Sequence, residues 1–172
     1  MNVPILSTPR LTLRGHHVDD LADCAAMWAD PRVTQHIGGR PFTREEVWSK
    51  VLRYVGHWAL LGFGYWVVVE KASGRFAGEV GFADFHREME PSLDGAPEAG
   101  WVLSPSSHGK GFATEALRAA LGWLEASRSS KRSVCIIDPG NAASFRVADK
   151  CGFVEIARTT YKGGPTVLLE RA

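Results

Sequence analysis

Two glycines, Gly109 and Gly111, separate a short apolar strand from an amphipathic helical pattern. The strand is predicted over residues 99–103, a turn-rich segment follows, and apolar residues recur at helical spacing from Ala113 to Leu124. Strand, glycine loop and helix in this order leave backbone N–H groups unpaired at a helix N-terminus, where the helix dipole is positive. Such a site suits a phosphate or pyrophosphate, so the sequence predicts an anion-binding loop here.

This loop departs from two common phosphate-binding patterns. A dinucleotide fingerprint requires a third glycine, but position 114 is Thr114. A P-loop continues from its last glycine into Lys and then Ser or Thr, but Gly111 is followed by Phe112. A purely structural turn is the alternative interpretation, because a Gly-x-Gly that opens a helix is not specific by itself.

Length and composition limit the class of protein. The 172 residues include 45% hydrophobic and 23% charged residues, which suffice for a sizeable core in one domain spanning residues 1–172. The formal net charge of +1 argues against a protein built to bind nucleic acid. Three cysteines without paired spacing and scattered histidines predict neither a disulfide framework nor a metal site.

The sequence also bears on location. The first residues lack a basic segment followed by a long apolar stretch, so we expect no signal peptide. No segment approaches the ~18 uninterrupted apolar residues of a membrane span. We therefore expect a cytoplasmic protein that does not act at a membrane.

Hydrophobic periodicity predicts the secondary structure. Seven strands are predicted, at residues 10–14, 65–69, 76–82, 99–103, 133–137, 153–160 and 166–169. Four helices are predicted to begin near residues 20, 43, 112 and 141. Thr43 and Glu46 form a capping-box pattern, and Asn141 is placed to cap the last helix. The order β-α-α-β-β-β-α-β-α-β-β predicts a mixed α/β domain rather than a doubly wound sheet.

Two motifs resemble one family. Residues 107–116, Ser-His-Gly-Lys-Gly-Phe-Ala-Thr-Glu-Ala, and residues 141–153, which begin with Asn and end with Lys-Cys-Gly-Phe, resemble GNAT-type N-acetyltransferases. Residues 8–14 and 78–81 resemble the branch that acetylates the N-termini of ribosomal proteins. The resemblance extends over nearly the whole chain, and the separation of roughly 30 residues between the two motifs makes it specific.

The resemblance implies a fold and a co-substrate. The fold is a single domain with a central, mostly antiparallel sheet of about seven strands, splayed at the cofactor cleft, and four helices. The co-substrate is acetyl-CoA, whose pyrophosphate would lie on the backbone amides of His108, Gly109, Lys110, Gly111, Phe112 and Ala113. Its pantetheine arm would lie beside Trp101, Val102 and Leu103, in the gap between strands 99–103 and 133–137.

The resemblance also implies roles for single residues. A backbone N–H near Val102 would polarise the thioester carbonyl. Asn141 would hold the pantetheine arm or cap its helix, and Ser144, one turn later, would contact the cofactor near sulfur. Many relatives have a tyrosine that protonates the departing thiolate, but the corresponding residue here is Ala148. Ser144 is then the remaining candidate donor, or no donor is needed.

Acetyl transfer to an amine requires a group that accepts a proton, because only the neutral amine is a nucleophile. Glu98, at the start of strand 99–103, and Glu79, on the neighbouring strand, are the candidate bases. The alternative for each is a solvated or ion-paired carboxylate. No nucleophilic cysteine is evident, so we expect direct transfer.

The sequence therefore predicts an acetyl-CoA-dependent N-acetyltransferase that acts on a primary amine. The branch resemblance favours the N-terminal amine of a protein or peptide. Two alternatives remain: an acetyltransferase for small amines such as antibiotics or polyamines, and a CoA-binding module with lost or regulatory activity. We expect a monomer or a homodimer.

Overall fold

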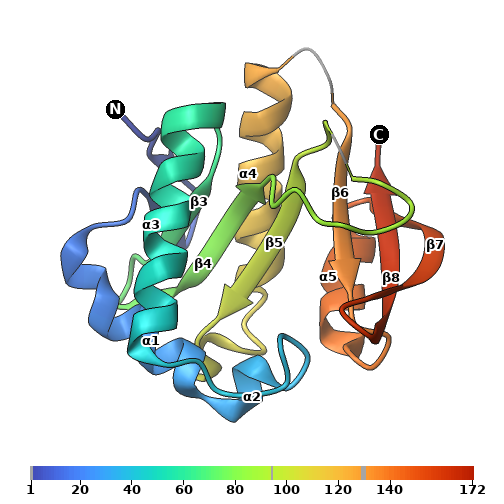
Figure 1. Cartoon of the computed structure of the whole chain (residues 1–172). Helices are drawn as coiled ribbons and strands as arrows, with labels where there is room; N and C mark the ends of the chain where they lie inside the picture. The colour runs from blue at the N-terminus through green and yellow to red at the C-terminus, as the bar shows by residue number, and fades with distance from the viewer. Residues whose placement is uncertain (1, 94, 129–130) are drawn as a thin grey trace.

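A single sheet organises the chain, with its strands in the order β1-β2-β3-β4-β5-β6-β8-β7 (Figure 1). The computed structural model describes residues 2–93, 95–128 and 131–172. Its strands are β1 (Leu6–Ser7), β2 (Leu11–Arg14), β3 (Tyr65–Glu70), β4 (Phe76–Ala83), β5 (Glu98–Leu103), β6 (Ser133–Ile137), β7 (Val154–Tyr161) and β8 (Gly164–Arg171).

The helices are α1 (Leu21–Ala29), α2 (Pro31–Thr34), α3 (Arg44–Leu61), α4 (Phe112–Ser127) and α5 (Ala142–Lys150). Two 3-10 helices, η1 (Val18–Asp20) and η2 (Pro105–Ser107), precede α1 and the glycine loop. In the described part of the chain, no helix is both long and apolar enough to cross a lipid bilayer.

The predicted order of elements is confirmed, with two short additions. β1 has two residues and α2 has four, and elements of this length show no periodicity that a sequence pattern could reveal. The described residues therefore form eight strands and five α-helices, where about seven and four were expected. The capping box is present: the Glu46 N–H donates to Thr43 Oγ1 (3.2 Å) and the Thr43 N–H donates to Glu46 Oε2 (2.8 Å).

β5 and β6 separate soon after they meet. They pair in parallel at Glu98 and Val134 and then diverge (Figure 1). On its other side β5 pairs with β4 along its whole length, and β6 pairs with β8. The sheet is therefore split beyond Glu98, as the resemblance implies, and the facing edges of β5 and β6 have no strand partner among the described residues.

The two faces of the sheet bear separate cores. In Figure 1, α1 and α3 lie in front of the sheet and α4 and α5 behind it. The main core joins α4 and α5 to the sheet and includes Ala99 and Leu103 of β5, whereas Val102 packs against a second core formed by α1 and α3. Because side chains alternate along a strand, Glu98 and Gly100 lie on the same side as Val102. We call this side, covered by α1 and α3, the front face.

Two glycines bring Tyr65 of β3 over the centre of the front face. A Cβ atom on Gly81 would lie 2.4 Å from the Tyr65 Cα, and one on Gly100 would lie 1.9 Å from the Tyr65 hydroxyl oxygen. A side chain at either position would push Tyr65 away. The Tyr65 ring also stacks on Tyr54 of α3, with ring centroids 4.2 Å apart, so this contact holds α3 over the sheet.

Candidate active site

The glycine loop has the backbone geometry expected of an anion site. Gly109 and Gly111 have φ angles of 74° and 78°, a region that favours glycine, and Gly111 is the N-cap of α4. Within the described residues, no hydrogen bond occupies the N–H groups of Gly109, Lys110 or Gly111. These donors and the free N–H groups of the first turn of α4 form one cluster. The cluster fits a pyrophosphate.

Side chains of the loop hold it in place. His108 Nε2 donates to the carbonyl of Leu103 (2.9 Å), which folds the loop back onto the end of β5. Phe112 is buried in the main core, so only its backbone is available to a ligand. Lys110 Nζ lies 3.6 Å from Glu70 Oε1, so part of its charge is already compensated. The anion site therefore depends mainly on backbone donors.

A second set of contacts braces the loop from the other end of the chain. Arg10 donates from Nη1 to the carbonyl of Lys110 (2.8 Å) and from Nε to Glu115 Oε2 (2.6 Å). Thr8 Oγ1 donates to Glu115 Oε1 (2.7 Å). Burial alone would raise the pKa of Glu115, but the bonds from Thr8 and Arg10 outweigh it and lower that pKa. The sequence analysis missed this brace, because its members lie over a hundred residues apart.

Hydrogen bonds at the two ends of β5 show which way its backbone groups point. The Val134 N–H of β6 donates to the carbonyl of Pro97 (3.0 Å). The Ser104 N–H, just beyond β5, donates to the carbonyl of Ala77 in β4 (2.9 Å). Because backbone groups alternate along a strand, odd-numbered residues of β5 point toward the gap and even-numbered residues toward β4.

The cleft-facing donors of β5 are therefore the N–H groups of Trp101 and Leu103. The N–H of Val102 points toward β4, so the thioester donor expected near Val102 has to come from one of its neighbours. The Trp101 side chain is half-buried and packs against the main core, which leaves its backbone at the open edge. A pantetheine amide could pair with this edge as a strand would.

The start of α5 forms the other wall of the gap. Asn141 Oδ1 accepts from the Ser144 N–H (3.1 Å), so the helix-capping role of Asn141 is confirmed. Ser144 is half-buried in the first turn. Ala148, one turn later, is fully buried in the main core. Its methyl group offers no proton donor.

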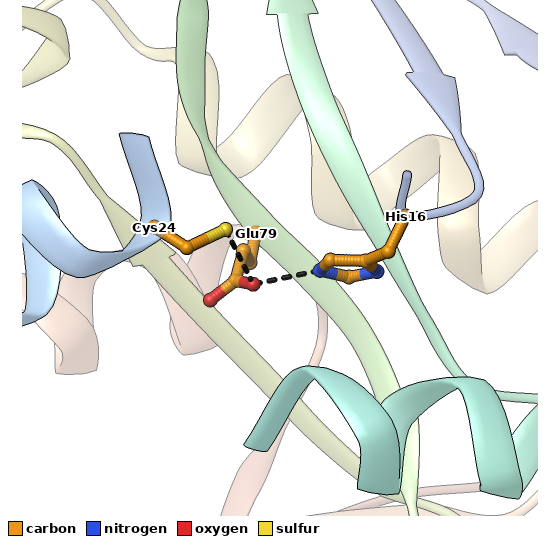
Figure 2. Close-up of side chains that lie close together, drawn as sticks. All are labelled: His16, Cys24 and Glu79. Carbon is orange, nitrogen blue, oxygen red and sulfur yellow. Dashed lines mark hydrogen bonds and ion pairs between the residues drawn. The ribbon is translucent and has the colours of Figure 1, made fainter. Parts of the chain in front are cut away.

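Glu79 lies at the centre of a buried polar cluster on the front face (Figure 2). His16 Nε2 donates to Glu79 Oε1 (2.7 Å) and Trp28 Nε1 donates to Oε2 (2.8 Å). The Cys24 thiol also donates to Oε1 (3.4 Å). The His16 and Glu79 side chains are each 1% exposed. Two separate parts of the chain, the segment after β2 and helix α1, thus converge on one carboxylate.

The protonation of Cys24 follows from this burial. Burial and the neighbouring Glu79 raise the pKa of Cys24, so the sulfur remains a thiol and donates its proton to the carboxylate. Ligand atoms of His16, Cys24 and Glu79 lie within 4.8 Å of one another, a spacing that could hold a metal ion. The hydrogen bonds among these three residues already account for the arrangement. The other ring nitrogen of His16, Nδ1, is buried and has no hydrogen-bond partner among the described residues.

Glu98 has a different environment. Arg87 donates from Nε to Glu98 Oε2 (2.7 Å) and from Nη2 to Oε1 (2.8 Å), a two-point ion pair. Burial alone would lower the pKa of Arg87, but the contacts with Glu98 outweigh it and raise that pKa. The guanidinium also lies over the ring of Tyr161 in β7 (4.9 Å). Glu98 is therefore fixed in an ion pair that bridges the two halves of the split sheet.

The two carboxylates lie on the same face but not together. Glu98 pairs with Ala83 across β4 and β5, whereas Glu79 pairs with Val102. Four residues along a strand correspond to about 13 Å, so one amine cannot use both. Glu79 lies at the level of the donors on either side of Val102, which places it nearer the expected thioester carbonyl.

A split sheet beside an anion-binding loop is the architecture implied for an acetyl-CoA-dependent transferase, and comparison with known proteins agrees. Residues 10–154 match the family described as "Acetyltransferase (GNAT) domain". The uncharacterized protein YkkB of Bacillus subtilis (strain 168) is 31% identical over 151 residues, which cover 86% of this chain and 83% of the relative. The chain belongs to the GNAT acetyltransferase family, and it is an acetyltransferase with acetyl-CoA as co-substrate.

Solved structures show the same fold. A GNAT-family acetyltransferase from Bordetella pertussis is 30% identical, with a TM-score of 0.87 over 99% of this chain and 100% of the other. The Salmonella typhimurium enzyme that modifies the N-terminal serine of ribosomal protein L7/L12 is 18% identical (TM-score 0.79, 98% of both chains). Spermidine N-acetyltransferase from Vibrio cholerae, solved with CoA and spermine, is 19% identical (TM-score 0.73, 95% and 96%). AAC(6')-Ib, solved with Parmomycin and acetyl-CoA, is 20% identical (TM-score 0.76, 94% and 93%).

Proposed function

We propose that this enzyme acetylates the N-terminal amine of a protein or peptide. The observation that supports transfer is that β5 has a free strand edge and that the glycine loop after it has unoccupied amides. Together these two features suit acetyl-CoA. The resemblance of residues 8–14 and 78–81 to the ribosomal-protein branch supports the acceptor, as does the fold shared with the Salmonella enzyme. Small amines are the second candidate acceptors, because the spermidine and AAC(6')-Ib enzymes share the same fold.

In the proposed reaction, the Glu79–His16 pair takes the proton of the attacking amine. With Nε2–H of His16 donating to Glu79, its Nδ1 retains a lone pair, and a proton added there gives an imidazolium beside a carboxylate. The Trp101 N–H stabilises the oxygen of the carbonyl as the amine nitrogen bonds to its carbon. The carbon–sulfur bond then breaks, and the thiolate of CoA leaves with the electron pair.

Glu98 is the alternative base. Protonation of Glu98 would remove the negative charge that pairs with Arg87 and leave a half-buried guanidinium without its counterion. We therefore assign Glu98 a structural role, as the bridge between the halves of the sheet. Glu79, with His16, is assigned the role of proton acceptor.

The function is tested first by acetyl-CoA itself. At a concentration about 100 times its dissociation constant, acetyl-CoA should stabilise the fold by about 2.7 kcal/mol, seen as a rise in melting temperature. The purified chain should also release CoA when given peptides with a free N-terminus, but not the same peptides with a blocked one. A folded chain whose melting temperature does not change with acetyl-CoA would contradict cofactor binding. Equal CoA release in the presence of blocked and free peptides would contradict transfer to the amine.

Ser144 should make only a small contribution. A hydroxyl that hydrogen-bonds to the leaving sulfur is worth on the order of 1 kcal/mol, so Ser144→Ala should lower turnover by about fivefold at most. The loss should be similar across the pH range, because a serine hydroxyl keeps its proton throughout. The measurement is the pH–rate profile with one fixed peptide. A profile that superimposes on that of the parent enzyme would remove Ser144 from the mechanism.

A further inference from the structure

Three cations lie on the front face beside the proposed acceptor site, and two of them form no ion pair with any carboxylate in the part of the chain that the structure describes. Lys50 and Arg53 are three residues apart on α3, and Arg87 belongs to the loop between β4 and β5. Arg87 is paired with Glu98. Within the described residues, neither Lys50 nor Arg53 forms an ion pair with a carboxylate.

Lys50 lies next to the Glu79 cluster. Its ammonium nitrogen is 4.3 Å from the ring centroid of Trp28 and 4.8 Å from that of Phe42, and these two rings stack on each other. The same indole of Trp28 donates its N–H to Glu79. The ammonium group is therefore held one ring away from the proposed proton acceptor.

Arg53 extends the positive charge toward Glu98. Its guanidinium carbon lies 5.5 Å from the ring centroid of Phe85, and that of Arg87 lies 4.7 Å from the same centroid. Arg53 is exposed and Lys50 is half-buried. The two cations on α3 thus lie along the part of the front face between Glu79 and Glu98, where we place the acceptor.

The acidic groups around Lys50 are already in use. Glu79 accepts three hydrogen bonds within its own cluster, and Glu46 is held by Arg40 and by the Thr43 N–H. Burial, followed by the nearby Arg53, lowers the pKa of Lys50 to about 8. With a pKa of about 8, Lys50 remains mostly charged at pH 7, and no described carboxylate forms an ion pair with it.

We propose that the acceptor of this enzyme has a carboxylate close to its amine, and that Lys50 and Arg53 bind this carboxylate. The inference rests on the proposed acetyl transfer and specifies its acceptor. Either an acidic residue near the N-terminus of a peptide or the carboxylate of a free amino acid would supply the group. A polycationic amine such as spermine would bring like charges to both unpaired cations.

The experiment measures CoA release with five acceptors: C-terminally amidated peptides that begin Ser-Asp-Glu, Ser-Ala-Ala and Ser-Lys-Lys, free glutamate, and spermine. We expect the acidic peptide or glutamate to exceed Ser-Lys-Lys by about tenfold or more in kcat/KM at low ionic strength, with the advantage falling as salt rises. The peptide and the free amino acid distinguish the two sources of carboxylate.

Variants then connect the preference to the two cations. Lys50→Gln and Arg53→Gln should each raise KM for the preferred acidic acceptor by about tenfold, while Lys50→Arg should retain most of the preference. Arg44→Gln removes an equal charge from the first turn of the same helix and serves as the matched control. The melting temperatures of all four variants show whether each is folded.

The outcomes separate this inference from the proposed function. Equal or better use of spermine or Ser-Lys-Lys would overturn the acidic acceptor while supporting acetyl transfer. Indistinguishable effects of Lys50→Gln and Arg44→Gln would also overturn it. A chain that binds acetyl-CoA but fails to release CoA with any of the five amines would overturn both proposals.

Discussion

Replacing Glu79 by glutamine should slow acetyl transfer by roughly 10²–10⁴-fold, the usual loss when a general base is removed. Glutamine keeps the size of the side chain and one oxygen that can accept from the Trp28 N–H. It cannot stabilise an imidazolium at His16, so the proton of the amine has no acceptor. The effect should lie in kcat, with the dissociation constant of acetyl-CoA little changed. His16→Gln should reproduce most of the loss.

Glu98→Gln is the matched comparison. It should lower the melting temperature, because it leaves Arg87 with half of its charge-assisted bonds. Its loss of turnover should be far smaller than that of Glu79→Gln. Rates and thermal melts of both variants, measured with one peptide, decide the assignment. A larger rate loss in Glu98→Gln than in Glu79→Gln would identify Glu98 as the general base and contradict the role given to His16.

Replacing Gly111 by valine should weaken acetyl-CoA binding by roughly 10²-fold or more, since two or more charge-assisted bonds from the loop would be lost. Gly111 has a φ angle of 78°, which a β-branched residue adopts only under strain. Its added Cβ atom would also lie 3.4 Å from Arg10 Nη2, within the brace of the loop. The measurement is a titration with acetyl-CoA followed by melting temperature or heat.

Gly163→Val is the control for backbone strain. Gly163 has a φ angle of 79° in the turn between β7 and β8, and a Cβ atom there would meet nothing within 4 Å. Both variants should lose a similar amount of stability, about 1–2 kcal/mol, because a left-handed conformation costs this much without glycine. Only Gly111→Val should lose acetyl-CoA. Equal affinities in the two variants would mean that the loop does not bind the pyrophosphate.

The sequence predicted most of the fold because the relevant signals are local. Helical periodicity, the Thr43–Glu46 capping box and the asparagine cap of α5 each depend on residues within one or two turns, and all three are present. The glycine loop was recognisable for the same reason. β1 and α2 were missed because two or four residues are too few to show a period.

The environment of the carboxylates could not be predicted in this way. His16, Cys24 and Trp28 reach Glu79 from sequence distances of 51 to 63 residues, and only the packing of α1 and of the segment after β2 on the front face brings them together. Arg87 reaches Glu98 from an irregular loop. The identity of the cleft-facing donor on β5 also required the observed hydrogen bonds, because a shift of one residue reverses the direction of every backbone group.

The brace formed by Thr8, Arg10 and Glu115 makes the glycine loop a product of the whole chain. Closing a segment of about a hundred residues costs conformational entropy that no local contact of the loop repays. We therefore expect the loop to be completed only after β2 has joined the sheet and α4 has docked against it. In folding terms, affinity for acetyl-CoA is a long-range property that arises late. A short excised peptide containing the loop would have the right residues and lack the site.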